Sequence, residues 1–345
     1  MKALTLTAVG GRDHLRVQEL PEPAIESLGD VLVRVHAMAL NRLDLLVAEG
    51  LPGANYSFPH VVGCDGAGTV VEVGASVTGL KPGDRVMINP TISCRSCPWC
   101  LQGEDSLCGS LQVLGEHRSG TAREYLVLPG DNLARVPDSM PWPQAAAFSL
   151  ATLTAWRMLT TRGQVRAGET VLIWGIGGGV SMAALQVARH LGARTIVTSG
   201  TDAKLEVARS LGADVALNHQ RDDVVAETRK LTGGMGADAI VDSNGEQSWR
   251  QSLRALRRGG RLLICGATTG PHVSLDLRRL FWHQWSLLGS TLGSRREYAE
   301  IVRLAGEGKL WPVVDRVVPW DQAFVAIERL ARGEQVGKLV IEVTA

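Results

Sequence analysis

The stretch Thr170–Ala193, with the sequence TVLIWGIGGGVSMAALQVARHLGA, decides the fold of this chain. Its apolar run 171–174 predicts a buried strand, and Gly175, Gly177, Gly178 and Gly179 follow where the backbone must turn. From Val180 the apolar residues return at helical spacing until Gly192, which predicts the end of the helix. Free N–H groups and the positive helix end of such a unit bind a pyrophosphate. A flexible glycine loop between two core elements is the alternative.

The composition is that of an ordinary globular protein. The chain has 345 residues, enough for two domains, and a net charge of +1. This charge balance predicts no nucleic-acid partner, and no apolar run is long enough to cross a membrane. The N-terminal residues 1–15 lack the apolar core of a signal peptide, so we expect a cytoplasmic protein.

Four of the six cysteines lie close together in the segment NPTISCRSCPWCLQGEDSLCG. Cys94, Cys97, Cys100 and Cys108 have the spacing C-x2-C-x2-C-x7-C, which lets four thiolates converge from one loop. Four thiolates close a tetrahedral shell and leave no open position for chemistry. The spacing therefore predicts one structural Zn²⁺ per subunit; an iron–sulfur cluster or a metal-free loop is the alternative.

The order of the remaining patterns predicts an α/β fold with two domains. The first ninety residues are rich in strand patterns, and strands alternate with helices after the glycine turn, as in a doubly wound parallel sheet. The strands expected in this half are 171–174, 195–198, 214–217, 239–242, 261–265 and 287–291, and the helices are 145–159, 180–191, 204–211 and 224–231. A helix at 295–306 and a strand at 338–343 close the chain.

These motifs together resemble the medium-chain dehydrogenase/reductase superfamily of zinc alcohol dehydrogenases and quinone oxidoreductases. The resemblance covers nearly the whole chain and includes VGCDGAGTVVEVG, GLKPGDRV, AAAFSLATLTAW and GKLVIEV. It implies a GroES-like β-rich catalytic domain over 1–150, with the zinc lobe at about 90–110. It also implies a Rossmann domain over 151–293, a return to the first domain over 294–345, and a homodimer or homotetramer.

The positions of the family's catalytic zinc ligands are altered. Against that pattern, the first cysteine falls on Asn41, the histidine falls on Cys64, and the third ligand falls at or beside Leu150. Neither an amide nor an aliphatic side chain is a good zinc ligand. Asn41-x-x-Asp44 resembles the zinc-free quinone oxidoreductases, in which the asparagine lines the nicotinamide pocket. An improvised zinc site with Asp44, Cys64 and Asp65 is the alternative, as are simple turn or core roles for these residues.

The end of the second Rossmann strand favours NADP(H). An NAD site places an acid there, whereas this chain has Ser199, Gly200 and, shortly after, Lys204. His219 matches a position that helps hold the 2′-phosphate in relatives that use NADPH. Asp202 leaves NAD(H) possible, although we expect it to cap the following helix. The resemblance implies further cofactor contacts at Thr154, Asn244, Gly266, Leu288, Gly289, Ser290 and Lys338.

The sequence as a whole predicts an NAD(P)H-dependent oxidoreductase that transfers hydride between nicotinamide and a quinone, an enone or a related carbonyl compound. The site residues expected for this chemistry are Asn41, Asp44, Cys64 and Asp65. A zinc-dependent alcohol or aldehyde dehydrogenase with altered ligands is the alternative within the family. An NADPH-binding sensor or binding module with little turnover is the alternative of another class.

Overall fold

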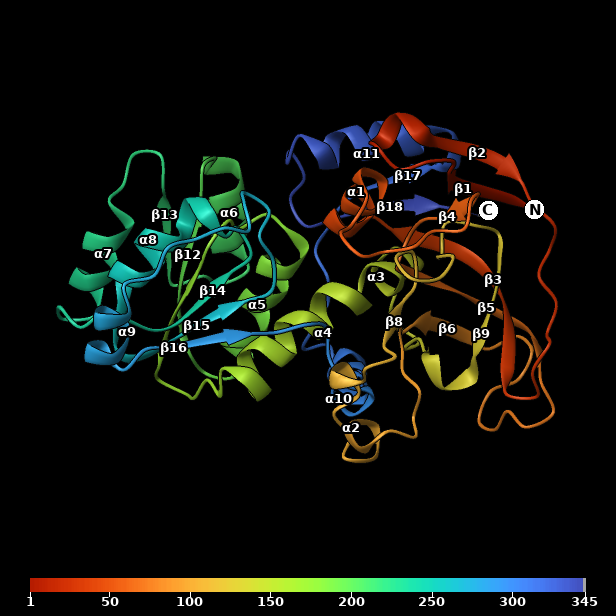
Figure 1. Cartoon of the computed structure of the whole chain (residues 1–345), viewed down its shortest axis with the longest axis horizontal. Coiled ribbons are helices and arrows are strands. Elements are labelled where there is room, and N and C mark those ends of the chain that lie inside the picture. The colour runs from red at the N-terminus through yellow and green to blue at the C-terminus, as the bar shows by residue number, and fades with distance from the viewer. Residues whose placement is uncertain (344–345) are drawn as a thin grey trace. The chain divides into compact units, whose positions relative to one another are not determined.

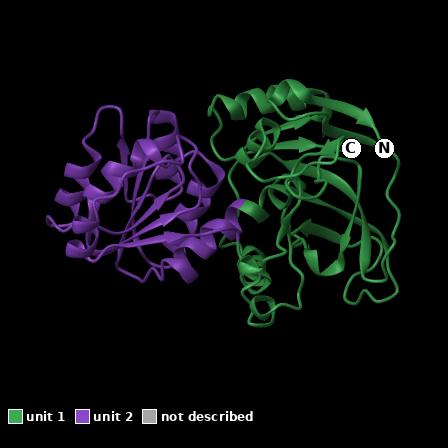
Figure 2. Cartoon of the chain, viewed as in Figure 1, with its two compact units in different colours: residues 1–150, 293–345 green, residues 151–292 purple. Residues whose placement is uncertain are grey.

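The computed structural model describes residues 1–343, which fall into two compact units. Unit 1 contains residues 1–150 together with the C-terminal segment from 293 onward, and unit 2 contains residues 151–292 (Figure 2). The C-terminal segment thus belongs to the same unit as the N-terminus. Each unit has its own hydrophobic core.

Unit 2 is built on the predicted parallel sheet, with helices on both sides (Figure 1). Its six strands lie in the order β13-β12-β11-β14-β15-β16, and every neighbouring pair is parallel. The strands are β11 (Thr170–Ile173), β12 (Arg194–Ser199), β13 (Val215–Asn218), β14 (Ala237–Asp242), β15 (Leu256–Ile264) and β16 (Ser286–Gly289). The helices are α5 (Gly179–His190), α6 (Asp202–Ser210), α7 (Val224–Leu231), α8 (Glu246–Ala255) and α9 (Leu277–His283). The α/β fold class is confirmed.

Two segments differ from the sequence-based expectation in their boundaries. Strand β15 begins at Leu256, five residues before the expected strand, although Gly259 adopts a positive φ of 66°. The register against β14 shifts at this point, so the strand accommodates the glycine in an irregularity. The helical segment expected over 145–159 is divided into α3 (Trp142–Ala147) and α4 (Ser149–Arg157), followed by a π-helical turn over Met158–Arg162.

Unit 1 is β-rich, as predicted for the GroES-like domain (Figure 1). Its main sheet has the order β10-β6-β5-β3-β18-β17, and β9 also pairs with β3. The strands of this sheet are β3 (Asp30–Ala39), β5 (Asp65–Val73), β6 (Arg85–Ile88), β9 (Tyr125–Pro129), β10 (Leu133–Arg135), β17 (Val314–Pro319) and β18 (Lys338–Glu342). A second sheet contains β1 (Lys2–Leu6), β2 (Leu15–Glu19) and β4 (His60–Val61), and β7 (Thr91–Ile92) pairs with β8 (Gln112–Val113). Further helices are α1 (Arg42–Glu49), α2 (Pro98–Leu101), α10 (Arg295–Gly306) and α11 (Ala323–Ala331).

Strand β18 lies between β3 and the edge strand β17 of the main sheet. It pairs with β3 so that Val340 lies opposite Ala39, and Ala39 in turn lies opposite Asp65 of β5. Asn41 follows β3 directly, Asp65 begins β5 and Lys338 begins β18. Three distant parts of the sequence therefore meet at one end of three adjacent strands. No helix over residues 1–343 is long and apolar enough to cross a membrane.

Candidate functional site

The four cysteines of the lobe converge as their spacing predicts. Their sulfur atoms all lie within 4.8 Å of one another, and three of the Sγ···Sγ distances are 3.5, 3.5 and 3.9 Å. A tetrahedron with Zn–S bonds of about 2.3 Å has S···S distances of about 3.8 Å, so the loop fits the ion closely. Backbone N–H groups of Cys97 and Ser110 donate to Sγ of Cys94 and Cys108 at 3.4 Å each. The structural zinc site is therefore present.

The protein surroundings act differently on two of the four thiols. Backbone N–H groups lower the pKa of Cys94 to about 6, because hydrogen bonds from Ser96 and Cys97 stabilise the thiolate. Burial raises the pKa of Cys100 to about 11. A bound cation offsets this desolvation, so the lobe is built to hold a positive ion at its centre.

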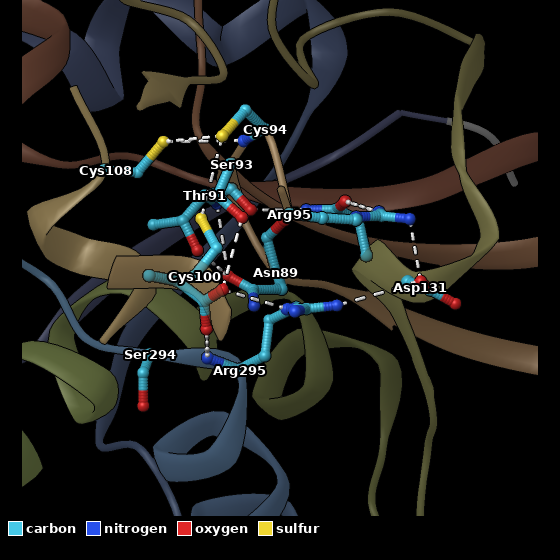
Figure 3. A network of polar contacts seen from close by, with 12 residues as sticks. Asn89, Thr91, Ser93, Cys94, Arg95, Cys100, Cys108, Asp131, Ser294 and Arg295 are labelled. Carbon is cyan, nitrogen blue, oxygen red and sulfur yellow. Dashed lines mark hydrogen bonds and ion pairs between the residues drawn. The ribbon is translucent and has the colours of Figure 1, made fainter. Parts of the chain in front are cut away.

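A polar network joins the lobe to the rest of unit 1 (Figure 3). The buried carboxylate of Asp105 accepts from the backbone N of Arg295 at 3.0 Å and from its Nε at 3.2 Å. Arg95, next to the first cysteine ligand, donates to Asp131 at 2.7 Å. Sequence patterns could not predict these contacts, because Asp105 and Arg295 are 190 residues apart.

The glycine turn of unit 2 has the conformation that phosphate binding needs. Gly175 and Gly177 have φ of 65° and 124°, a region that L side chains rarely adopt. Gly178 precedes α5 as its N-cap, and no side chain caps this end of the helix. Ser181, at the position where a glycine or alanine is usual, donates its hydroxyl to the carbonyls of Gly175 and Gly178 at 2.9 and 3.0 Å. The extra hydroxyl therefore stabilises the turn, and the helix end remains available for an anion.

The end of β12 differs in one respect from the expectation. Thr201, and not Asp202, is the N-cap of α6, and it makes no side-chain cap. The Asp202 carboxylate accepts from both terminal nitrogens of Arg221 at 2.9 Å and from Asn218 Nδ2 at 3.0 Å. The capping role expected for Asp202 was therefore wrong. Its exposed carboxylate is held instead by partners at the end of β13, a pairing that the sequence did not indicate.

Other predicted cofactor residues lie at the carboxyl ends of the parallel strands. Ser199 ends β12, and a Cβ at Gly200 would lie 3.2 Å from Nε2 of His219, whose pKa is lowered by burial. Asn244 follows β14, Gly266 follows β15, and Ser290 follows β16. The remaining predicted contacts in unit 2 are Thr154, which is buried in α4, Lys204 in α6, and Leu288 and Gly289 in β16.

Unit 2 therefore fits a nicotinamide dinucleotide. The glycine turn accepts a pyrophosphate, and the predicted residues gather where ligands bind in parallel α/β sheets. Among the described residues, the buried hydroxyl of Ser290 has no hydrogen-bond partner, so it is open to a ligand group.

In unit 1 the predicted site residues form one buried cluster around a lysine. The ammonium of Lys338 donates to Asn41 Oδ1 at 2.5 Å and to Asp65 Oδ2 at 2.8 Å. Asn41 Nδ2 donates to Asp65 Oδ2 at 2.9 Å and lies 3.4 Å from Cys64 Sγ. The backbone N–H of Leu150 completes the cluster by donating to Asp65 Oδ1 at 2.7 Å. Lys338, which the resemblance assigned to the cofactor, thus lies among Asn41, Cys64 and Asp65.

The fourth predicted residue, Asp44, is hydrogen-bonded to the backbone beside this cluster. Its carboxylate accepts from the backbone N–H groups of Asn41 at 2.7 Å and Gly63 at 3.1 Å. Burial is the main cause that raises the pKa of Asp44 to about 6. Burial also raises the pKa of the Cys64 thiol well above its ordinary value, with the neighbouring carboxylates acting in the same direction. These surroundings therefore favour the thiol form of Cys64 over the thiolate.

This cluster does not fit a second zinc ion. The three positions that hold the family's catalytic ligands carry an amide, a single cysteine and a leucine, and the nearest carboxylate is paired with Lys338. Within residues 1–343, only the four cysteines of the lobe form a group of three or more metal-ligating side chains. A catalytic metal needs three protein ligands and an open position, and this arrangement does not supply them.

Comparison with known proteins identifies the family. Residues 27–138 match the alcohol dehydrogenase GroES-like domain, and residues 179–307 match the zinc-binding dehydrogenase domain. The alcohol dehydrogenase of Geobacillus stearothermophilus is 32% identical over 95% of this chain and 96% of its own length. The NAD-dependent alcohol dehydrogenase of Sulfolobus acidocaldarius is 31% identical over 100% of both chains. A solved structure of an NAD-dependent alcohol dehydrogenase is 44% identical, with a TM-score of 0.96 over 100% of both chains.

These similarities correct the predicted reaction. The sequence was expected to belong to a quinone or enone reductase, yet the full-length relatives are alcohol dehydrogenases, and two of those named are NAD-dependent. They also give no support for NADP(H) over NAD(H). The prediction failed because it inferred the class of substrate from the residues around Asn41, and these residues do not determine that class. The chain belongs to the medium-chain, zinc-type alcohol dehydrogenase superfamily of oxidoreductases.

Proposed function

We propose that this protein is an alcohol dehydrogenase that interconverts a small alcohol and its aldehyde or ketone. The full-length similarity to NAD-dependent alcohol dehydrogenases, at 44% identity to one solved structure, carries this proposal. A bound nicotinamide supplies or accepts the hydride, and the protein provides binding and orientation. The turn over Gly175–Gly179 would hold its pyrophosphate, and the buried Ser290 hydroxyl would serve as a further ligand.

Turnover of an alcohol panel, followed by the absorbance of reduced nicotinamide, tests this function. Gly177→Val is the matched negative control, because a Cβ at this residue would lie 2.6 Å from Lys204 Cδ and the φ of 124° disfavours any side chain. We expect alcohol-dependent reduction of NAD⁺ by the wild type and loss of cofactor binding in the variant. Wild-type protein that binds the cofactor but oxidises no alcohol and reduces no carbonyl compound would contradict the proposal and favour a sensor or binding module.

We further propose that NAD(H) is the working cofactor and that NADP(H) is poorly excluded. The named relatives favour NAD(H). In this chain, however, Ser199 stands where an acid would repel a 2′-phosphate, and the nearby Asp202 is paired with Arg221. Ser199→Asp should lower kcat/KM for NADPH by about tenfold or more relative to NADH, because like charges in contact cost several kcal/mol. An unchanged ratio of kcat/KM for NADPH to kcat/KM for NADH would show that the 2′-position of the cofactor does not lie beside residue 199.

We also propose that the protein forms a homodimer or homotetramer through the open edge of the unit 2 sheet. Strand β16 lies at this edge, and the preceding α9 buries none of its residues. Phe281 and Trp282 of this helix are each 67% exposed. Large apolar side chains beside a free strand edge favour association. Trp282→Glu should shift the mass measured by light scattering toward the monomer.

A further inference from the structure

A basic pocket lies between α8 and α9 of unit 2, and none of the predicted cofactor residues lines it. Its volume is about 600 Å³, which lies in the range of small-molecule sites. The charged residues of its lining are four arginines and one aspartate: Arg250, Arg254, Arg278, Arg279 and Asp276. The chain as a whole has 36 basic and 35 acidic side chains, so the pocket departs strongly from the overall charge balance.

Two buried tryptophans hold the walls of this basic pocket. Trp249 of α8 donates from Nε1 to the Ser274 carbonyl at 2.8 Å, which ties α8 to the segment before α9. Trp285, which follows α9, donates from Nε1 to the Arg257 carbonyl at 3.0 Å. The Arg279 guanidinium lies 5.5 Å from the centroid of the Trp285 ring, a cation–π contact that orients it. The elements that carry the arginines are therefore fixed relative to each other.

Three of the four guanidinium groups have no carboxylate partner within residues 1–343. Asp276 accepts from Arg278 Nε at 3.1 Å and from its Nη2 at 3.0 Å, so the carboxylate of the pocket is engaged by one arginine. Arg250 and Arg254 are exposed and lie four residues apart on α8, so they share one face of that helix. Together with Arg279 they present three forked donors that no acidic side chain satisfies.

This uncompensated charge also acts on a neighbouring histidine. The pKa of His283, the last residue of α9, is lowered first by desolvation and then by the charges of Arg258, Arg279 and Arg229. Cations close to an imidazole disfavour its protonated form. The pocket therefore lies in a positive field that includes α9 and attracts anions.

We propose that the basic pocket binds a small organic anion with a diphosphate group. An arginine fork matches a phosphate group in a bidentate arrangement, and two linked phosphate groups can engage α8 and α9 together. Leu253 and Leu275 of the lining give an apolar surface for the organic part of the ligand. The site lies within unit 2 and is independent of the proposed reaction. Phe281 and Trp282, to which association of subunits is assigned, are not lining residues.

Binding of inorganic pyrophosphate, measured by titration calorimetry, tests the proposal. The glycine turn would also accept pyrophosphate, so the titration uses protein saturated with NADH and, independently, the Gly177→Val variant. We expect one pyrophosphate per subunit in both preparations. Arg250→Gln and Arg254→Gln should each weaken this binding by about tenfold, because each removes a charge-assisted donor. Arg194→Gln, at an exposed arginine of the same unit outside the pocket, is the control.

The carboxylate of the pocket gives a second test, in which the expected change has the opposite sign. Asp276 caps α9 by accepting from the backbone N–H of Arg278 at 2.9 Å, and asparagine caps a helix about equally well. Asp276→Asn should therefore keep the fold, release the Arg278 guanidinium and strengthen the binding of pyrophosphate.

Three results would overturn the proposal. The first is pyrophosphate binding that saturation with NADH abolishes, because the anion would then occupy only the glycine turn. The second is equal affinity in the wild type, Arg250→Gln and Arg254→Gln, because the arginines would then form only a solvated surface. The third is binding by Trp282→Glu and not by the wild type, which would show that association of subunits covers the pocket. Pyrophosphate binding at the pocket without turnover of any alcohol would support this site and count against the proposed function.

Discussion

Unit 1 contains two clusters that differ in the charge of the groups they bring together. One cluster consists of four thiols, and the other surrounds a lysine ammonium. In the lobe, four sulfur atoms surround a space that fits one tetrahedral cation. In the other cluster, the corresponding centre is taken by the ammonium of Lys338, held by Asn41 and Asp65. The lobe needs an external ion to offset its thiolates, whereas the second cluster supplies its own cation. The comparison teaches that the capacity of each site for a metal depends on the side chains at that site and is a separate question from family membership.

The largest expected effect comes from breaking the lobe. Cys97→Ser leaves three thiols, so zinc should be lost and the free energy of unfolding should fall by more than about 5 kcal/mol. Elemental analysis and urea unfolding measure the two effects. Cys265→Ser, a change outside the lobe, is the control and should retain both zinc and stability. Retention of a full equivalent of zinc by the Cys97 variant would show that the lobe is not the site.

The second cluster should respond strongly to the loss of one charge. Asp65→Asn leaves the Lys338 ammonium buried without its carboxylate, and the expected loss in the free energy of unfolding is about 3–5 kcal/mol. Zinc content should stay at one per subunit, which separates this cluster from the lobe. If Asp65→Asn lost zinc as well as stability, the cluster and the lobe would be coupled, and the two sites could not be treated as independent.

The raised pKa of the buried Asp44 carboxyl group predicts that the free energy of unfolding depends on pH. Asp44 has a pKa of about 6 in the folded protein against an ordinary value of 3.8, so the folded state binds the extra proton between these pH values. Stability should therefore fall as the pH rises from about 4 to about 6 and stay lower above that, by about 3 kcal/mol from this residue. Asp44→Asn removes this slope. Unfolding free energies of both proteins across this range test it, and identical slopes would contradict the assignment.

The smallest effect is expected at the outer edge of the lobe network. Asp131 is 62% exposed where it pairs with Arg95. Exposed ion pairs contribute about 0–1 kcal/mol, so Asp131→Ala should change stability by no more than this and should not release zinc. Asp105→Ala removes a buried carboxylate from the same network and is the informative comparison, because it should cost clearly more. Equal effects would show that burial does not distinguish the two contacts.

Local patterns predicted local structure well. The strand, glycine turn and helix over Thr170–Ala193 and the convergence of the four cysteines each depend on residues close in sequence, and both were found. The Lys338 cluster could not be predicted in the same way, because Lys338 and Asp65 are 273 residues apart and meet only through the pairing of β18 with β3. The pairing of Asp202 with Arg221 likewise depends on where β13 ends beside β12.

The predicted reaction failed for a related reason. Asn41 and Cys64 stand at positions of the family's catalytic ligands, and the prediction took the reaction class from these two residues alone. Lys338 was assigned to the cofactor, whereas the structure places its ammonium between Asn41 and Asp65.

The zinc content of the wild-type protein tests the central claim most directly. After saturation with zinc and removal of loosely bound metal, elemental analysis should give one ion per subunit, and that ion should be absent from Cys97→Ser. This result would confirm that the lobe alone holds metal. Two ions in the wild type, with one surviving in Cys97→Ser, would contradict the account and return Cys64 and Asp65 to consideration as metal ligands.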